Sequence, residues 1–190
     1  MWFANYSWVN GDLAVFDALI AEIEAQGGVP LAVFHNRFRD ADLGNMSVAE
    51  VAETFFRKDG QTLIEVLLSP QSFSLAVGGP GSETVLPGLD VPVLQLIQTY
   101  SPRADWEDTL QAVSPMDVST SVAQPEFDGV IIGTVVGTRD ETGIDPATGA
   151  RLMLRTPVPE RCAHVVRWAM MWARLRRTPP AERKVAIICH

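Results

Sequence analysis

The chain has 190 residues, 47% of them hydrophobic, with 15 basic residues against 23 acidic ones and a net charge of -8 at pH 7. This charge balance argues against binding to nucleic acid or to an acidic membrane surface, because either partner requires a basic face. No apolar run reaches the roughly 18 residues that a membrane-spanning helix needs. The two cysteines, Cys162 and Cys189, lie far apart, so we predict a cytoplasmic protein without a disulfide framework or a structural zinc site.

The first part of the chain predicts a β-α-β unit. Residues 1–6 form a short apolar run that predicts a strand, and residues 30–34 predict a second, buried strand. Between them we expect a helix that ends at Gly27, because apolar side chains recur at helical spacing before it, at Leu13, Phe16, Leu19, Ile20 and Ile23. Such a unit requires parallel pairing of its two strands and a right-handed crossover.

The middle of the chain predicts further strands separated by helices and loops. Ser47 followed by Glu50 three residues later is the pattern of a capping box at the start of a helix. Residues 62–68 and 91–97 are apolar and rich in β-branched side chains, so we expect two more buried strands. The glycine-rich residues between them favour a loop, and short helices are expected between residues 102 and 122.

The last third predicts a hairpin, a long helix and a final strand. Two β-rich runs flank a loop at 140–149, which indicates an antiparallel hairpin inserted at about 130–156 rather than a calcium-binding EF-hand loop. Residues 159–177 carry an apolar face and end in arginines, as expected for a helix. Residues 185–189 predict one more buried strand, followed only by His190, so we expect the chain to be a piece of a larger protein.

Together these elements predict an α/β fold in one domain over residues 1–190. We expect an open, mostly parallel, Rossmann-like sheet of the flavodoxin or periplasmic-binding-protein type, with helices on both faces and the antiparallel hairpin added. Sheets of this kind bind ligands outside the carboxyl ends of their strands. Polar and aromatic residues at those ends are therefore the candidate substrate-binding residues: Tyr6, His35, Arg37, Thr99 and His190.

A turn with two acids, residues 124–129 (Gln-Pro-Glu-Phe-Asp-Gly), precedes an apolar run. Pro125 biases Gln124 toward extended backbone, and in an extended segment Glu126 and Asp128 share one face. We expect this turn near the same edge of the sheet, where it holds charge in place. A capped turn with solvated acids is the alternative interpretation.

Motifs for nucleotide binding are missing from the sequence. The glycine-rich stretch Gly78-Gly79-Pro80-Gly81-Ser82 lacks the lysine of a phosphate-binding P-loop. The first strand-to-helix turn has a single glycine, Gly11, instead of a dinucleotide fingerprint. We therefore expect any ATP hydrolysis to take place elsewhere. The three histidines also lie too far apart in the sequence for zinc-ligand spacing.

Three stretches of the sequence resemble the large subunits of the cobalt and magnesium chelatases, above all the cobaltochelatase (CobN) type. They are residues 32–44, which read AVFHNRFRDADLG, the acidic turn with its P-E-x-D-G pattern, and residues 172–186, which contain W-A-x-L-R-R-x-P-P. The similarity extends over essentially the whole chain, with the motifs in the order of the family. It implies that the chain is an internal segment of a much larger, multidomain subunit.

The resemblance also implies an activity. The family's large subunit binds a tetrapyrrole and inserts Co²⁺ into hydrogenobyrinic acid a,c-diamide in cobalamin biosynthesis, or Mg²⁺ into protoporphyrin IX. ATP is hydrolysed by separate AAA+ subunits, so we expect no ATP on this chain and no activity from the isolated segment. The family's acidic residues correspond to Glu126 and Asp128. We expect Glu126 to deliver the metal or to accept a pyrrole proton, with Asp128 orienting it.

Two departures from the family pattern leave the metal and the tetrapyrrole open. Gln124 stands where an aliphatic residue is expected, and the hairpin around Asp145 is longer than expected. Two other functions stay open as well. One is a non-catalytic domain that binds small ligands, as in periplasmic binding proteins. The other is a docking module for partner subunits, with the basic segment 174–184 as its contact surface.

Overall fold

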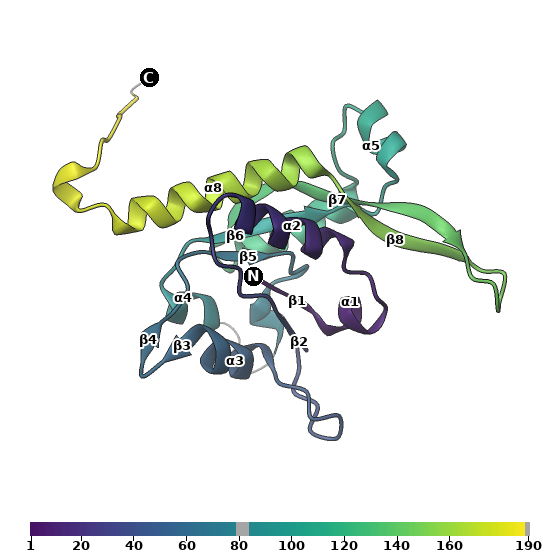
Figure 1. The fold of residues 1–190 in the computed structure, drawn as a ribbon, viewed down its shortest axis with the longest axis horizontal. Coiled ribbons are helices and arrows are strands. Elements are labelled where there is room, and N and C mark those ends of the chain that lie inside the picture. Colours follow the sequence, from purple (N-terminus) through teal and green to yellow (C-terminus); the bar gives the residue numbers. More distant parts are fainter. Residues whose placement is uncertain (79–83, 189–190) are drawn as a thin grey trace.

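A computed structural model describes residues 1–78 and 84–188 of the chain (Figure 1). Its strands are β1 (Trp2–Ala4), β2 (Val33–His35), β3 (Arg57–Lys58), β4 (Gln61–Thr62), β5 (Leu67–Ser69), β6 (Val93–Gln98), β7 (Ile131–Ile144) and β8 (Arg151–Pro157). Its α-helices are α1 (Asn5–Val9), α2 (Ala14–Ala25), α3 (Val48–Val51), α4 (Val85–Leu89), α5 (Arg103–Asp108), α6 (Pro115–Asp117), α7 (Gln124–Glu126) and α8 (Pro159–Arg177). Among the described residues, further segments are π-helical (η1, Ala52–Phe56; η4, Val118–Ala123) or 3₁₀-helical (η2, Leu75–Gly78; η5, Pro180–Glu182).

A mostly parallel sheet forms the middle of the molecule. Strands β5, β6 and β7 pair in parallel, and β8 runs antiparallel to β7. Strand β1 pairs in parallel with β2. The indole of Trp2 joins β1 to β5, because its Nε1 donates a 2.7 Å hydrogen bond to Ser69 Oγ. The predicted fold class, α/β with a mostly parallel sheet and an antiparallel hairpin, is confirmed.

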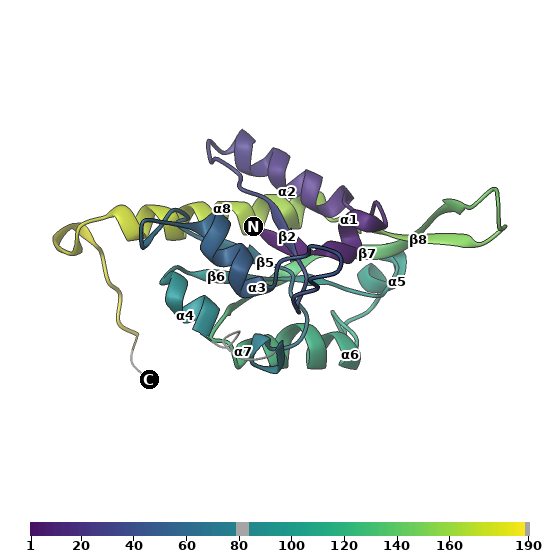
Figure 2. The same cartoon turned by 90° about the horizontal axis from the view of Figure 1, so that it is seen from below.

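Helices cover both faces of this sheet. Figure 2 shows α2 and α8 on one face and α4, α6 and α7 on the other. Because successive side chains of a strand point to opposite faces, neighbouring residues enter different hydrophobic cores. The core beside α2 and α8 contains Phe3, Leu68 and Leu94, whereas the opposite core contains Trp2, Leu67 and Val93.

The two longest helices agree with their predictions. Helix α8 has the predicted bounds, 159–177, and α2 occupies the predicted stretch before Gly27. They contact each other (Figure 1) and bury their apolar faces in one core. The predicted capping box of Ser47 and Glu50 is also confirmed, at the start of α3. Within the described ranges, no helix combines the length and the apolar character needed to cross a membrane.

Several predicted strands differ in extent. The strand expected at 30–34 is β2 (Val33–His35), and the strand expected at 91–97 is β6 (Val93–Gln98). The first strand is followed at once by helix α1, so residues 5 and 6 are helical rather than extended. The strand predicted at 62–68 is divided, because a tight turn at Asp59 and Gly60, with φ of 51° and 75°, folds β4 back onto β3. Its last two residues, together with Ser69, then form β5.

The predicted final strand is also corrected. Residues 185–188 form no strand, and the side chains of Val185, Ile187 and Ile188 are between 83% and 87% exposed. Within the described ranges no other strand lies beside them to pair with (Figure 1). Cys189 and His190, and the glycine-rich residues from 79 to 82, lie outside the described residues.

The predicted antiparallel hairpin at about 130–156 is confirmed. The first half of β7 pairs with β6 and its second half pairs with β8, so the hairpin extends from the sheet as an arm (Figure 1). At its tip the Asp145 carboxylate accepts hydrogen bonds from the backbone nitrogens of Ala147 (2.7 Å) and Thr148 (3.2 Å). This is the local bonding of a turn, in agreement with the predicted hairpin loop.

Candidate functional site

A cavity of about 590 Å³ opens at the carboxyl ends of β1, β2, β5 and β6. Parallel pairing brings these ends to one edge of the sheet, which is the edge predicted to bind a ligand. The volume is in the usual range of small-molecule pockets. The segments that follow the four strands provide most of the lining, with Asn5, Tyr6, Ser7, His35, Asn36, Arg37, Pro70, Gln71, Ser72, Phe73, Gln98 and Tyr100.

The structure brings together three of the five predicted substrate-binding residues. Tyr6, His35 and Arg37 all line the cavity. Thr99 instead lies behind the cavity wall, where it is 1% exposed and donates its hydroxyl to Asp117 at 2.8 Å. The adjacent Gln98 and Tyr100 face the cavity. His190 lies outside the described residues.

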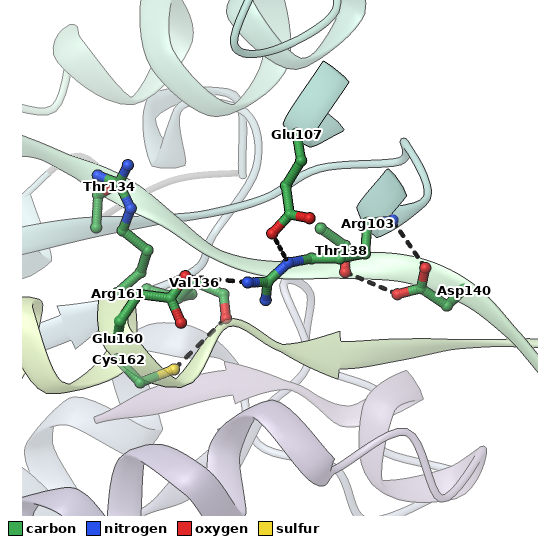
Figure 3. Close-up of polar contacts among 9 residues, drawn as sticks. All are labelled: Arg103, Glu107, Thr134, Val136, Thr138, Asp140, Glu160, Arg161 and Cys162. Atoms are coloured by element: carbon green, nitrogen blue, oxygen red, sulfur yellow. Dashed lines mark hydrogen bonds and ion pairs between the residues drawn. The ribbon is translucent and has the colours of Figure 1, made fainter. Parts of the chain in front are cut away.

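The loop after β6 holds Tyr100 in a fixed place. The backbone nitrogen of Arg139, on β7, donates to the carbonyl of Ser101 at 3.1 Å. The Asp140 carboxylate accepts one hydrogen bond from the backbone nitrogen of Arg103, at 2.8 Å, and another from the Thr138 hydroxyl, at 2.7 Å (Figure 3). These contacts join the loop after β6 to β7 and so hold the aromatic ring of Tyr100 in position.

Side chains behind this loop connect α5 to α8. Figure 3 shows the Arg103 guanidinium between Glu107, on its own helix, and Glu160, at the start of α8, with nitrogen-oxygen distances of 2.5 and 3.0 Å. In the same region the buried Cys162 thiol donates to the carbonyl of Val136 at 3.5 Å. Burial raises the pKa of Cys162 to about 11. A thiol held in this neutral form is structural rather than nucleophilic.

A buried ion pair supports the rim of the cavity. Asp12 Oδ2 lies 2.7 Å from Arg155 Nη1, with the two side chains only 9% and 10% exposed. The Arg155 guanidinium lies 6.0 Å from the ring centroids of both Tyr6 and Tyr100, which is within cation-π range. The pair therefore joins aromatic residues from two strand ends. Sequence reasoning missed it because its two members are 143 positions apart and belong to no motif.

His35 is a deeply buried polar residue of the cavity wall. It is 2% exposed, its ring lies edge-on to Trp2 with centroids 5.1 Å apart, and neither ring nitrogen has a hydrogen-bond partner among the described residues. Burial, together with the charge of Arg37, lowers the pKa of His35 to about 4. His35 is therefore a neutral imidazole near pH 7, with one donor and one acceptor to offer a ligand.

The burial of His35 predicts a loss of stability in acid. Its folded-state pKa, about 4, lies below the unfolded value of 6.5, so between these pH values the unfolded chain binds more protons. Stability is complete above about pH 6.5 and is expected to fall by about 3 kcal/mol as the pH decreases to 4. Urea unfolding of the 190-residue chain at several pH values measures this slope. His35→Gln is expected to flatten the slope and the exposed His164→Gln to keep it, and equal slopes in all three proteins would refute the assignment.

The acidic turn differs from its prediction in both conformation and place. Gln124 has helical φ and ψ of -71° and -44°, and residues 124–126 form helix α7. Pro125 is the second residue of α7, next to the junction at which the π-helical segment η4 changes to α-helix. The turn precedes β7, and Asp128 and Gly129 line a smaller hollow of about 390 Å³ at the amino ends of β6 and β7. The turn therefore lies at the amino ends of these strands, not at the expected carboxyl edge.

The two acids of the turn have different surroundings. Asp128 accepts hydrogen bonds at 2.7 Å from both the Ser74 hydroxyl and the backbone nitrogen of Leu75. The Glu126 side chain is exposed and forms no hydrogen bond or ion pair with any residue in 1–78 or 84–188. Over the same described residues, no three His, Cys, Asp or Glu side chains gather into a set that could hold a metal ion.

Asp128 acts on the cavity through the loop that follows β5. By binding Ser74 and Leu75 it fixes this loop, and the Ser74 carbonyl in turn accepts a hydrogen bond from the guanidinium of Arg37. Phe73, in the same loop, has a φ of 65°, which is strained for a residue with a side chain. Its backbone nitrogen donates to the carbonyl of Thr120 at 2.7 Å, which holds the strained conformation.

The basic segment 174–184 is partly occupied by contacts within the chain. Arg176 donates to the carbonyl of Asp90, and Arg177 forms an ion pair with Glu65. These contacts tie the end of α8 to the loops before β5 and β6. Arg174 and residues 179–184 are exposed.

Comparison with known proteins relates the whole chain to one family. A family model described as CobN/Magnesium Chelatase matches residues 1–190. The aerobic cobaltochelatase protein CobN of Sinorhizobium sp. is 32% identical over 182 residues, which are 94% of this chain and 14% of that protein. A magnesium-chelatase subunit of Rhodobacter capsulatus is 30% identical over 194 residues, which cover 94% of this chain and 15% of that protein.

A solved structure shows the same fold. The catalytic subunit of cobaltochelatase from Mycobacterium tuberculosis matches 96% of this chain and 15% of its own, with a TM-score of 0.68 and 26% sequence identity. The chain thus spans about one seventh of the length of the proteins that it resembles.

Proposed function

Since the chain belongs to the CobN/magnesium chelatase family, we propose that it is a segment of the tetrapyrrole-binding large subunit of an ATP-dependent metal chelatase. The observation that carries this proposal is the cavity at the carboxyl edge of the sheet. It is lined by aromatic rings (Tyr6, Phe73 and Tyr100), by a neutral histidine and by an arginine. Such a wall offers flat apolar contacts to a conjugated ring and polar contacts to its substituents.

Metal insertion makes specific demands on a protein. Two pyrrole protons leave the tetrapyrrole while a divalent ion enters it, so a carboxylate that delivers the metal or accepts a proton promotes the reaction. We assign the delivery of the metal to Glu126, whose exposed carboxylate has no partner in the described part of the chain. Its turn lies at the amino ends of β6 and β7 rather than in the cavity wall, which suits a group that binds the metal ion before insertion. Asp128 positions it indirectly, because its bonds to Ser74 and Leu75 fix the turn to which both acids belong.

The proposed metal is Co²⁺ and the proposed tetrapyrrole is hydrogenobyrinic acid a,c-diamide, which places the reaction in cobalamin biosynthesis. The CobN name of one relative and the cobaltochelatase structure support this choice. Mg²⁺ and protoporphyrin IX are the alternative pair, supported by the magnesium-chelatase relative. The sequence has no P-loop lysine motif, which agrees with ATP hydrolysis by separate AAA+ subunits of a cytoplasmic complex.

A chelation assay tests the proposal. The full-length protein that carries this chain, combined with its ATPase subunits and ATP, is given Co²⁺ or Mg²⁺ with each tetrapyrrole, and the absorbance of the metallated product is followed. We expect insertion of Co²⁺ into hydrogenobyrinic acid a,c-diamide that requires ATP. Insertion of Mg²⁺ alone would reverse the choice of metal, and insertion of neither ion would contradict the chelatase function.

A further inference from the structure

Arg37 is a half-buried cation in the cavity wall with unused hydrogen-bond donors. Its guanidinium donates one hydrogen bond to the carbonyl of Ser74, while its buried Nε has no partner among the described residues. No carboxylate of those residues lies within ion-pair distance of it. Burial lowers the pKa of Arg37, which the charge of Asp128 partly offsets, but a guanidinium keeps its proton at any physiological pH.

A buried N–H donor without an acceptor lowers the free energy of unfolding. A buried N–H without an acceptor loses the hydrogen bond that it makes with water in the unfolded chain. The neighbouring arginine of the cavity rim, Arg155, avoids this cost through its buried carboxylate partner, Asp12. Several exposed arginines of this acidic chain also have carboxylate partners, among them Arg39 with Glu50 and Arg177 with Glu65. Arg37 therefore has the properties of a residue that receives an anion from outside the chain.

The surroundings of Arg37 define what kind of anion fits. The guanidinium lies 6.0 Å from the centroid of the Phe73 ring, which is 46% exposed. Across the cavity, Tyr6 and Tyr100 are 56% and 51% exposed. Arg155, which also lies against Tyr6 and Tyr100, is already paired with Asp12, and helix α1, whose first residues line the cavity, is only five residues long. Among the described residues that line the cavity, Arg37 is the one with a cationic side chain, and a single planar guanidinium suits a carboxylate.

We propose that Arg37 binds a carboxylate substituent of the tetrapyrrole, while Phe73, Tyr6 and Tyr100 contact the ring. The planar guanidinium offers a carboxylate two parallel N–H donors. This bidentate contact fixes the orientation of the macrocycle in the cavity and strengthens its binding. The inference rests on the proposed function and adds to it the group by which the substrate is oriented. Asp128 contributes from a distance, since it fixes the Ser74 carbonyl to which Arg37 is bonded.

Titration with a matched pair of ligands tests this inference. The full-length protein is titrated with deuteroporphyrin IX, which has two free carboxylates, and with its dimethyl ester, and binding is followed by fluorescence. We expect the wild-type protein to bind the acid about 10- to 100-fold more tightly than the ester. Arg37→Gln is expected to bind both ligands with the weak affinity of the ester. Arg39→Gln, which removes the same charge two residues away on an exposed side chain, is expected to behave like the wild type.

The possible outcomes separate the inference from the proposed function. If the wild type binds neither of these porphyrins nor hydrogenobyrinic acid a,c-diamide, the assignment of the cavity to a tetrapyrrole is wrong, and the inference falls with it. If the wild type binds both and Arg37→Gln leaves the preference for the acid unchanged, only the role of Arg37 is wrong. Should Arg37→Gln fail to fold, Arg37→Lys replaces it, because lysine keeps the charge but loses the second parallel donor. We then expect a preference for the acid reduced to less than about 10-fold, and an unchanged preference would overturn the inference.

Discussion

Replacement of Glu126 by glutamine in the full-length protein is expected to slow metal insertion by about 100-fold or more. Glutamine keeps the shape of the side chain but presents no negative charge to the metal ion. A 100-fold loss in rate corresponds to about 2.7 kcal/mol of lost transition-state stabilisation. The rate of insertion at saturating metal, tetrapyrrole and ATP measures the effect.

The surroundings of Glu126 make this result easy to interpret. Because the exposed carboxylate has no partner in the described part of the chain, Glu126→Gln should change the free energy of unfolding by no more than about 0.5 kcal/mol. Glu24→Gln, on the exposed side of α2, is the matched control and should retain full activity. A near-normal rate for Glu126→Gln would remove Glu126 from the mechanism. Equal losses in both variants would point to a general effect of charge.

Replacement of Asp12 by alanine is expected to destabilise the 190-residue chain by about 3–5 kcal/mol. The carboxylate accepts hydrogen bonds from the backbone nitrogen and the side chain of Arg155, at 2.8 and 2.7 Å. Without it the Arg155 charge is left buried and uncompensated, and breaking a buried pair in this way carries a cost of that size. Urea unfolding at pH 7 measures the free energy of unfolding.

A second carboxylate separates this effect from a change in net charge. Asp42 is exposed, in the loop after β2, and Asp42→Ala should change the stability by no more than about 0.5 kcal/mol. Since Arg155 also contacts Tyr6 and Tyr100, Asp12→Ala should in addition weaken tetrapyrrole binding by the full-length protein at temperatures where that protein is still folded. A loss of stability below about 1 kcal/mol would show that the pair is accessible to water in solution.

The cavity could be predicted from the sequence because one topological rule governs it. Apolar runs identify strands, parallel strands end at the same edge, and the residues after them meet there. His35 and Arg37 were found in this way, as was Tyr6, which lies in helix α1 directly after the first strand. Thr99 does not line the cavity, because its hydroxyl donates a hydrogen bond to Asp117 inside the fold. Asp117 lies 18 residues further along the chain, so the strand pattern alone does not show this contact.

The acidic turn could not be predicted, because its conformation depends on the preceding residues. Pro125 by itself favours an extended conformation of Gln124. However, Gln124 directly follows the π-helical segment η4 and has helical φ and ψ, so the helical conformation continues through Pro125. Asp128 then accepts hydrogen bonds from Ser74 and Leu75.

The C-terminal segment also differs from its prediction because of its surroundings. Residues 185–188 have the composition of a buried strand but lack a neighbouring strand within the described part of the chain. Composition gives the tendency to form a strand, and the partner decides whether one forms.

The binding of a tetrapyrrole at the carboxyl edge of the sheet is tested most directly by a structure of the ligand complex. Electron cryo-microscopy of the full-length protein with bound deuteroporphyrin IX would locate the macrocycle. We expect ring density against Tyr6, Phe73 and Tyr100, with one carboxylate at Arg37. A macrocycle ordered elsewhere in the protein, with this cavity empty, would contradict the proposed site.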